Sequence, residues 1–168
     1  MNYVLESLNL NLRPCAEADV ELLLDHWTKP LVRQYLFDDQ VTDRPTVVSF
    51  VEQSKSTFET LGYGLWMLTD KVDGGFRGVC GCLEKETKPD LLFSIEPDFW
   101  GNGLATESAL CVIAYLSKTS KVKEIIATVD KPNTISIAVL EKLGMQMTEE
   151  RVIEGNPILF YALEVSAT

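Results

Sequence analysis

A short apolar run, a glycine-containing turn and an amphipathic helix follow one another within residues 91–116, and this succession constrains the fold most. Residues 91–95 form a run of strand length, and Pro97 ends it, because proline cannot donate a hydrogen bond to a sheet ladder. The turn at residues 100–103 contains two glycines, which allow tight backbone angles and close approach by a ligand. From Leu104 the apolar residues recur at helical spacing.

This corner is an expected anion-binding site. The first N–H groups of a helix have no partner within the helix and lie at the positive end of its dipole, so they favour an anion such as a pyrophosphate. The patterns G-x-G-x-x-G and G-x-x-x-x-G-K-[ST] are both missing, because Leu104-Ala-Thr follows Gly103 and no lysine comes next. A nucleotide-phosphate binder is therefore the weaker interpretation.

Residues 95–107, Ile-Glu-Pro-Asp-Phe-Trp-Gly-Asn-Gly-Leu-Ala-Thr-Glu, resemble the acetyl-CoA motif of the GNAT N-acetyltransferase family. The resemblance is greatest to the branch similar to the ribosomal-protein-alanine N-acetyltransferases. Gly103 and Ala105 match the general pattern Q/R-x-x-G-x-G/A, and Trp100 stands where glutamine or arginine is usual. This motif implies that the turn holds the pyrophosphate of coenzyme A.

Two further blocks extend the resemblance over nearly the whole chain. Residues 10–19, Leu-Asn-Leu-Arg-Pro-Cys-Ala-Glu-Ala-Asp, are similar to the opening segment of the family. Asn133-Thr-Ile-Ser136 and Glu141-Lys-Leu-Gly-Met145 are similar to a late segment. Three matched blocks in the right order are more specific than one.

Hydrophobic periodicity predicts a mixed α/β sheet with helices on its faces, in a single domain spanning residues 1–168. The predicted order, β-α-α-β-β-β-α-β-α-β-β, is also that of the family, which implies a GNAT-like sheet that is splayed at its centre. Strands are expected at residues 8–12, 65–69, 76–83, 91–95, 121–129, 145–153 and 158–165. Helices are expected at 18–27, at 32–36, from an Asp43 cap to a break at 61–64, from 104, and from an Asn133 cap to Gly144.

The resemblance implies how the cofactor is held. Backbone amides across the turn bind the pyrophosphate, and the pantetheine arm pairs like an extra strand with the central strand. A backbone N–H near Ile95 stabilises the oxyanion, Asn133 holds the pantetheine, and the Ser136 hydroxyl donates to the leaving sulfur. The residues expected to contact the cofactor are Phe93, Ser94, Ile95, Trp100, Gly101, Asn102, Gly103, Leu104, Ala105, Thr106, Asn133 and Ser136.

The sequence does not fix the general base that attack by an amine requires. Asp90, Glu96 and Glu154 are the candidate carboxylates, and Glu154 is slightly favoured because its neighbour Gly155 suggests a loop over the site. A water relay could replace all three. His26, the only histidine, has no partner pattern and is expected on a helix surface.

Composition limits the partners. The net charge of −10 repels nucleic-acid backbones, so no nucleic acid is expected, and it attracts a cationic acceptor. Neither a membrane segment of about 18 apolar residues nor a signal peptide is present, so no membrane partner is expected. Four cysteines without a framework favour reduced thiols and a cytoplasmic location. Cys80 and Cys82 are assigned to core packing, and no metal is expected.

Together with these observations, the resemblance implies an N-acetyltransferase that moves the acetyl group of acetyl-CoA to a primary amine by direct attack in a ternary complex. A covalent route is disfavoured because no cysteine lies in a nucleophile motif. The acceptor is a protein N-terminus or a small amine, and the resemblance makes a homodimer an open expectation. The alternative is a non-catalytic acyl-CoA-binding sensor or interaction module, because residues 133–144 lack the tyrosine that much of the family uses as an acid.

Overall fold

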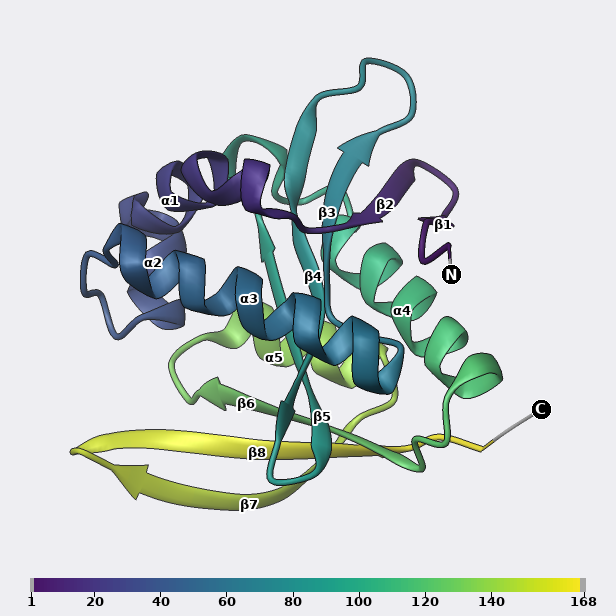
Figure 1. Cartoon of the computed structure of the whole chain (residues 1–168). Helices are drawn as coiled ribbons and strands as arrows, with labels where there is room; N and C mark the ends of the chain where they lie inside the picture. The colour runs from purple at the N-terminus through teal and green to yellow at the C-terminus, as the bar shows by residue number, and fades with distance from the viewer. Residues whose placement is uncertain (1, 167–168) are drawn as a thin grey trace.

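One eight-stranded sheet with helices on both faces organises the chain (Figure 1). The computed structural model describes residues 2–166, and none of the helices within that range is long and apolar enough to cross a membrane. The strands are β1 Leu5–Glu6, β2 Leu10–Pro14, β3 Leu65–Asp70, β4 Phe76–Lys85, β5 Lys88–Ile95, β6 Glu124–Asp130, β7 Gln146–Ile153 and β8 Asn156–Glu164. The helices are α1 Val20–Thr28, α2 Pro30–Leu36, α3 Arg44–Leu61, α4 Leu104–Thr119 and α5 Thr134–Lys142, with short 3-10 turns η1 Glu17–Asp19 and η2 Pro97–Phe99.

The strand order β1-β2-β3-β4-β5-β6-β8-β7 joins two antiparallel halves. β1 to β5 pair in succession, and β8 lies between β6 and β7. Among the described residues, β5 and β6 are the only parallel neighbours. The predicted mixed α/β sheet is confirmed, with two differences in order. β1 precedes the first predicted strand, and three helices lie between β2 and β3, where the predicted order counts two. The additional helix is α2, which matches the helix expected at residues 32–36.

β5 separates from β6 almost at once. The two strands share a single pairing, Asp90 with Ile126, whereas β5 pairs with β4 along its whole length. Pro97 opens η2 directly after β5, so the chain turns away from the sheet at that point. The central splay that the family resemblance implied is therefore present, and one edge of β5 faces a gap.

Two apolar clusters fix the sheet between its helices. On one face, α1, α2 and most of α3 pack against sheet residues such as Met67. On the other face, α4 and α5 pack against residues such as Ile125. The side chains of β5 alternate between the two layers, because Leu92 packs with the first cluster and Phe93 with the second.

Several predicted bounds differ from the structure. β5 begins at Lys88, three residues before the expected start, and β6 begins at Glu124, three residues after it. β2 begins at Leu10, and Leu8 is 85% exposed, so the buried alternation starts two residues later than expected. The loop expected at residues 154–157 is a two-residue turn. Glu154 and Gly155 have φ angles of 51° and 81°, and positive φ at both positions is what a tight hairpin of this kind requires.

Gly81 of β4 is predicted to tolerate no side chain, because a Cβ built there would lie 2.0 Å from the carbonyl oxygen of Gly64. We expect Gly81→Ala to lower the free energy of unfolding by about 3 kcal/mol or more, measured by urea denaturation. Gly74→Ala is the control, since Gly74 has a positive φ of 72° but open space around its Cβ position. That variant should cost about 1 kcal/mol. Equal losses in the two variants would contradict the packing argument.

Candidate active site

A cavity of about 1000 Å³ opens where β5 and β6 diverge. Residues of the α2 region between Leu31 and Asp38 border it on one side of the sheet. The N-terminus of α4 and one face of α5 border it on the other side. Because the gap connects both layers, a ligand bound along α4 and α5 can meet a second ligand that enters beside α2.

The glycine turn presents a row of free backbone donors to this cavity. Gly101 and Gly103 have φ angles of 81° and 73°, and a Cβ at either position would meet nothing within 4 Å. The first backbone hydrogen bond into α4 is Glu107 N–H to the Gly103 carbonyl, 2.9 Å. The amides of residues 101–106 therefore have no acceptor among the described residues. Trp100 is also expected to contact the cofactor through this turn, but its amide is not part of the row of free donors. It donates instead to the Pro97 carbonyl at 3.2 Å.

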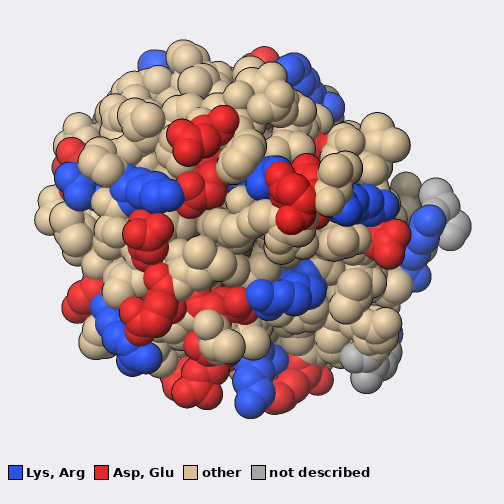
Figure 2. Space-filling view, turned by 90° about the horizontal axis from the view of Figure 1, so that it is seen from above, with Lys and Arg blue, Asp and Glu red and all other residues tan. Residues whose placement is uncertain are grey.

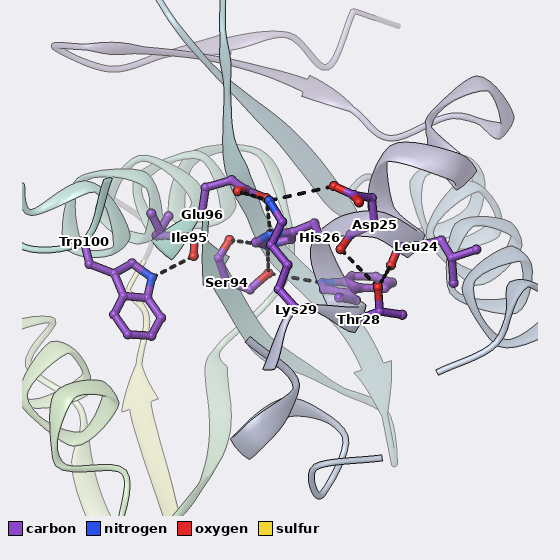
Figure 3. A network of polar contacts seen from close by, with 10 residues as sticks. Leu24, Asp25, His26, Thr28, Lys29, Ser94, Ile95, Glu96 and Trp100 are labelled. Carbon is purple, nitrogen blue, oxygen red and sulfur yellow. Dashed lines mark hydrogen bonds and ion pairs between the residues drawn. The ribbon is translucent and has the colours of Figure 1, made fainter. Parts of the chain in front are cut away.

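The free edge of β5 supplies a second row of donors. The Glu96 amide donates to the Arg77 carbonyl of β4 at 2.8 Å. In an antiparallel ladder such bonds alternate along a strand, so the amides of Phe93 and Ile95 point to the opposite edge, toward the gap. The indole Nε1–H of Trp100 donates to the Ile95 carbonyl at 2.8 Å and ties the glycine turn to the end of β5 (Figure 3).

Most residues predicted to contact the cofactor border the same cavity. Those that line it are Phe93, Ser94, Ile95, Trp100, Gly101, Gly103, Leu104, Ala105, Thr106, Asn133 and Ser136. Asn102 is not among the lining residues, and its side-chain amide donates instead to the Phe99 carbonyl at 2.9 Å. The structure thus brings residues from β5, the turn, α4 and α5 to one place.

The start of α5 is held by its own cap. Asn133 Oδ1 accepts from the Ser136 amide at 3.1 Å, as the Asn133 cap predicted, so the side-chain NH₂ of Asn133 is left to donate. The Ser136 hydroxyl has no hydrogen-bond partner among the described residues and borders the cavity. Both side chains are therefore placed to contact a ligand.

The three candidate carboxylates lie in different environments. Asp90 lines the cavity, and burial raises its pKa to about 6 although Lys85 opposes the shift. Glu154 is exposed at the β7–β8 turn and is not a lining residue, so its role as a base stays a prediction without support from its position. Glu96 is buried, and its oxygens contact His26 Nδ1 at 2.7 Å and Lys29 Nζ at 2.5 Å.

His26 is completely buried, which corrects its expected place on a helix surface. Its Nε2 lies 3.0 Å from the hydroxyl oxygen of Ser94, and that oxygen accepts a hydrogen bond from Trp27 Nε1 at 3.2 Å. Figure 3 shows Ser94, His26, Glu96 and Lys29 in one network. Burial lowers the pKa of His26 although Glu96 opposes the shift. The helical stripe could have indicated this burial, because His26 follows Leu23 by one turn.

Charge is mixed on the face of the molecule seen in Figure 2, where acidic and basic side chains lie beside one another. Within the cavity the balance is acidic, because Asp38, Asp90 and Asp130 are all lining residues, with Lys142 as a basic one. Burial and the nearby Asp38 raise the pKa of Asp130. The cavity therefore favours a cationic ligand on part of its wall.

Comparison with known proteins identifies related sequences. The family model described as "Acetyltransferase (GNAT) domain" matches residues 9–146. The uncharacterized protein YkkB of Bacillus subtilis is 33% identical over 106 residues, which cover 60% of this chain and 62% of that relative, less than two thirds of its length. The uncharacterized N-acetyltransferase p20 of Bacillus licheniformis is 24% identical over 140 residues, covering 82% of this chain and 79% of that relative.

A solved structure has a similar fold. RimL, described as a ribosomal L7/L12 alpha-N-protein acetyltransferase in complex with coenzyme A, superposes with a TM-score of 0.83 at 17% identity. The superposition covers 98% of this chain and 99% of RimL. At this identity the likeness concerns the fold alone.

The raised pKa of Asp90 predicts a pH-dependent cost to stability. With a folded-state pKa of about 6 against an ordinary value of 3.8, ionisation disfavours the folded state, so stability is lost as the pH rises between these values. We expect the stability advantage of Asp90→Asn over the wild type to grow by about 1–2 kcal/mol from pH 4 to pH 7, measured by urea denaturation.

Asp43→Asn is a control of opposite sign. Hydrogen bonds from the Thr46 hydroxyl and amide lower the pKa of Asp43, so its ionised form stabilises the fold and that stability is lost as the pH falls. Asparagine keeps the helix cap. A pH-independent difference for Asp90→Asn would show that its carboxyl titrates normally.

Proposed function

The chain belongs to the GNAT acetyltransferase family, and from this premise we propose that it transfers the acetyl group of acetyl-CoA to a primary amine by direct attack in a ternary complex. The single observation that carries the proposal is the row of six amides at residues 101–106 without acceptors among the described residues. Such donors at the start of a 16-residue helix suit the pyrophosphate of coenzyme A.

The remaining cavity residues fit the rest of the cofactor. The amides of Phe93 and Ile95 would pair with the pantetheine arm, and the Ile95 amide lies at the end of the strand, where an oxyanion donor is needed. Asn133 would donate to the pantetheine, and the unpartnered hydroxyl of Ser136 would donate to the departing sulfur. The thioester supplies an activated acetyl group; the chain supplies the donors that hold and orient it.

We infer that the acceptor enters beside α2, on the side of the sheet opposite to α4 and α5. The acidic residues of the cavity wall, Asp38, Asp90 and Asp130, would attract an ammonium group before it loses its proton. RimL is described as acting on a protein N-terminus, and a similar acceptor or a small polyamine suits this cavity. In the cofactor-sensor alternative the same cavity would bind acetyl-CoA without turnover.

Gly103→Glu should abolish binding of acetyl-CoA, measured by isothermal titration calorimetry. The carboxylate would enter the open space beside the free amides, repel the pyrophosphate and impose a side chain on a positive φ. Gly74→Glu is the matched control, because Gly74 has nearly the same φ and equally open space but lies in the β3–β4 turn. Retained affinity in Gly103→Glu would place the cofactor elsewhere.

Free coenzyme A should be released when the protein is incubated with acetyl-CoA and a suitable amine. We would test spermidine, phenethylamine and hexapeptides beginning with alanine or serine, with a thiol reagent as the readout and mass spectrometry of the product. We expect at least one acceptor to be acetylated. Tight binding of acetyl-CoA without turnover of any acceptor would instead favour the sensor alternative.

A further inference from the structure

We propose that Ser94, His26 and Glu96 form a proton relay in which the Ser94 hydroxyl takes the proton of the attacking amine and His26 takes the proton of Ser94. The relay is built from α1 and the end of β5, with distances of 3.0 Å from Ser94 Oγ to His26 Nε2 and 2.7 Å from His26 Nδ1 to Glu96 Oε1. This inference rests on the proposed acetyl transfer and assigns its general base.

The hydrogen bonds of Ser94 fix the direction of the relay. Its hydroxyl accepts from the indole N–H of Trp27, so the hydroxyl proton is free to point to His26 Nε2. A hydroxyl oxygen has two acceptor positions, and Trp27 occupies one of them. The second position is open among the described residues, and Ser94 borders the cavity. An amine proton can therefore approach the oxygen from the cavity.

The proton positions on His26 follow from its neighbours. A carboxylate oxygen 2.7 Å from Nδ1 requires a proton on that nitrogen, so in the neutral ring Nε2 is an acceptor. Once Nε2 is protonated, the Ser94 carbonyl oxygen at 3.3 Å can accept from it. Both nitrogens of the imidazolium would then be hydrogen bonded, which lowers the cost of charging a buried ring.

Few charges act on His26. The Glu96 carboxylate favours its protonated form, whereas Lys29 opposes it and is itself paired with Glu96. Asp25 and Asp98 act on Lys29 rather than on the ring directly. The Phe76 ring at the start of β4 packs against the imidazole nearly at a right angle, with the ring centroids 5.3 Å apart. Burial outweighs the carboxylate and lowers the pKa of His26, so the ring is ready to accept a proton at neutral pH.

The relay lies on the side where the acceptor is expected. Ser94 shares a face of β5 with Leu92, which packs in the layer of α1 and α2. Ile95, whose amide faces the gap, is the next residue along the strand. Asp90 lies four residues before Ser94 on β5, about 13 Å along an extended strand. It is therefore too far away to serve the same reacting centre. Glu96 is held by two partners and acts through His26.

The neutral amine forms its bond to the acetyl carbon, and one N–H proton moves to Ser94 Oγ while the Ser94 proton moves to His26 Nε2. The carbon–sulfur bond breaks, and the thiolate leaves with the electron pair. His26 then returns its proton through Ser94 to the thiolate or to cavity water. Glu96 accepts from His26 Nδ1 throughout.

The test compares Ser94→Ala and His26→Gln with the wild type, using the acceptor that is turned over fastest in the panel above. Glutamine keeps a donor and an acceptor at the His26 position but cannot take up a proton. We expect kcat near pH 7.5 to fall about 100-fold in both variants. Affinity for acetyl-CoA should be unchanged, because the β5 backbone meets the cofactor, whereas the Ser94 side chain lies on the face of α1 and α2. The ratio of wild-type to variant kcat should shrink at low pH as His26 becomes protonated, and at high pH as hydroxide replaces the relay.

Ser54→Ala is the control for a purely structural effect. Ser54 is a buried serine whose hydroxyl, like that of Ser94, has two hydrogen-bond partners, Cys15 and the Leu65 amide, but it lies outside the cavity. That variant should lose stability while it keeps the wild-type pH profile. A loss of kcat in Ser94→Ala that is the same at every pH would overturn the relay.

The single histidine of the chain allows a direct measurement that needs no acceptor. Nitrogen-15 NMR of the labelled imidazole should show a proton on Nδ1 and none on Nε2 at pH 7, with a midpoint below the usual value of about 6.5. That midpoint should coincide with the acid limb of the kcat ratio. A proton on Nε2 of the neutral ring, or an imidazolium at pH 7, would overturn the relay even if no amine in the panel is turned over.

Discussion

The early separation of β5 from β6 is the constraint on which the rest of the site depends. If the two parallel strands paired beyond Asp90 and Ile126, the amides of Phe93 and Ile95 would donate hydrogen bonds to β6. A buried backbone donor without a partner costs about 1–3 kcal/mol, so such donors persist only beside a space that water or a ligand can enter. The gap between the strands is therefore both the cause of the free donors and the place where they can be satisfied.

The donor row of the glycine turn exists for a related reason, because its amides have no acceptor in the helix that they begin. Positive φ at Gly101 and Gly103 lets the chain enter α4 without a side chain over the first amides. The indole of Trp100 joins this turn to Ile95, so the two rows keep a fixed relation. A ligand with a pyrophosphate and an extended amide arm can satisfy both rows at once, which few other anions can do.

Features that arise from neighbouring residues could be predicted from the sequence. The strand–turn–helix corner and the caps at Asp43 and Asn133 depend on residues within a few positions of one another, and the structure contains all of them. The turn at Glu154 shows the limit of such signals. Glycine after a carboxylate suits a loop over the site and a tight hairpin equally, and here it forms the hairpin at a distance from the cavity lining.

The network around His26 could not be predicted in this way, because its members lie 67 to 70 residues apart and no period links them. Its physical cost also argues for a function. A buried pair of ionisable groups usually stabilises a fold no better than apolar residues of the same size would. The cluster of Trp27 and its apolar neighbours could have extended over this position with a leucine. This chain instead keeps a neutral imidazole, a carboxylate and a hydroxyl within hydrogen-bond distance of one another, and Ser94 lines the cavity. It therefore retains groups that can move a proton where the acceptor is expected to bind.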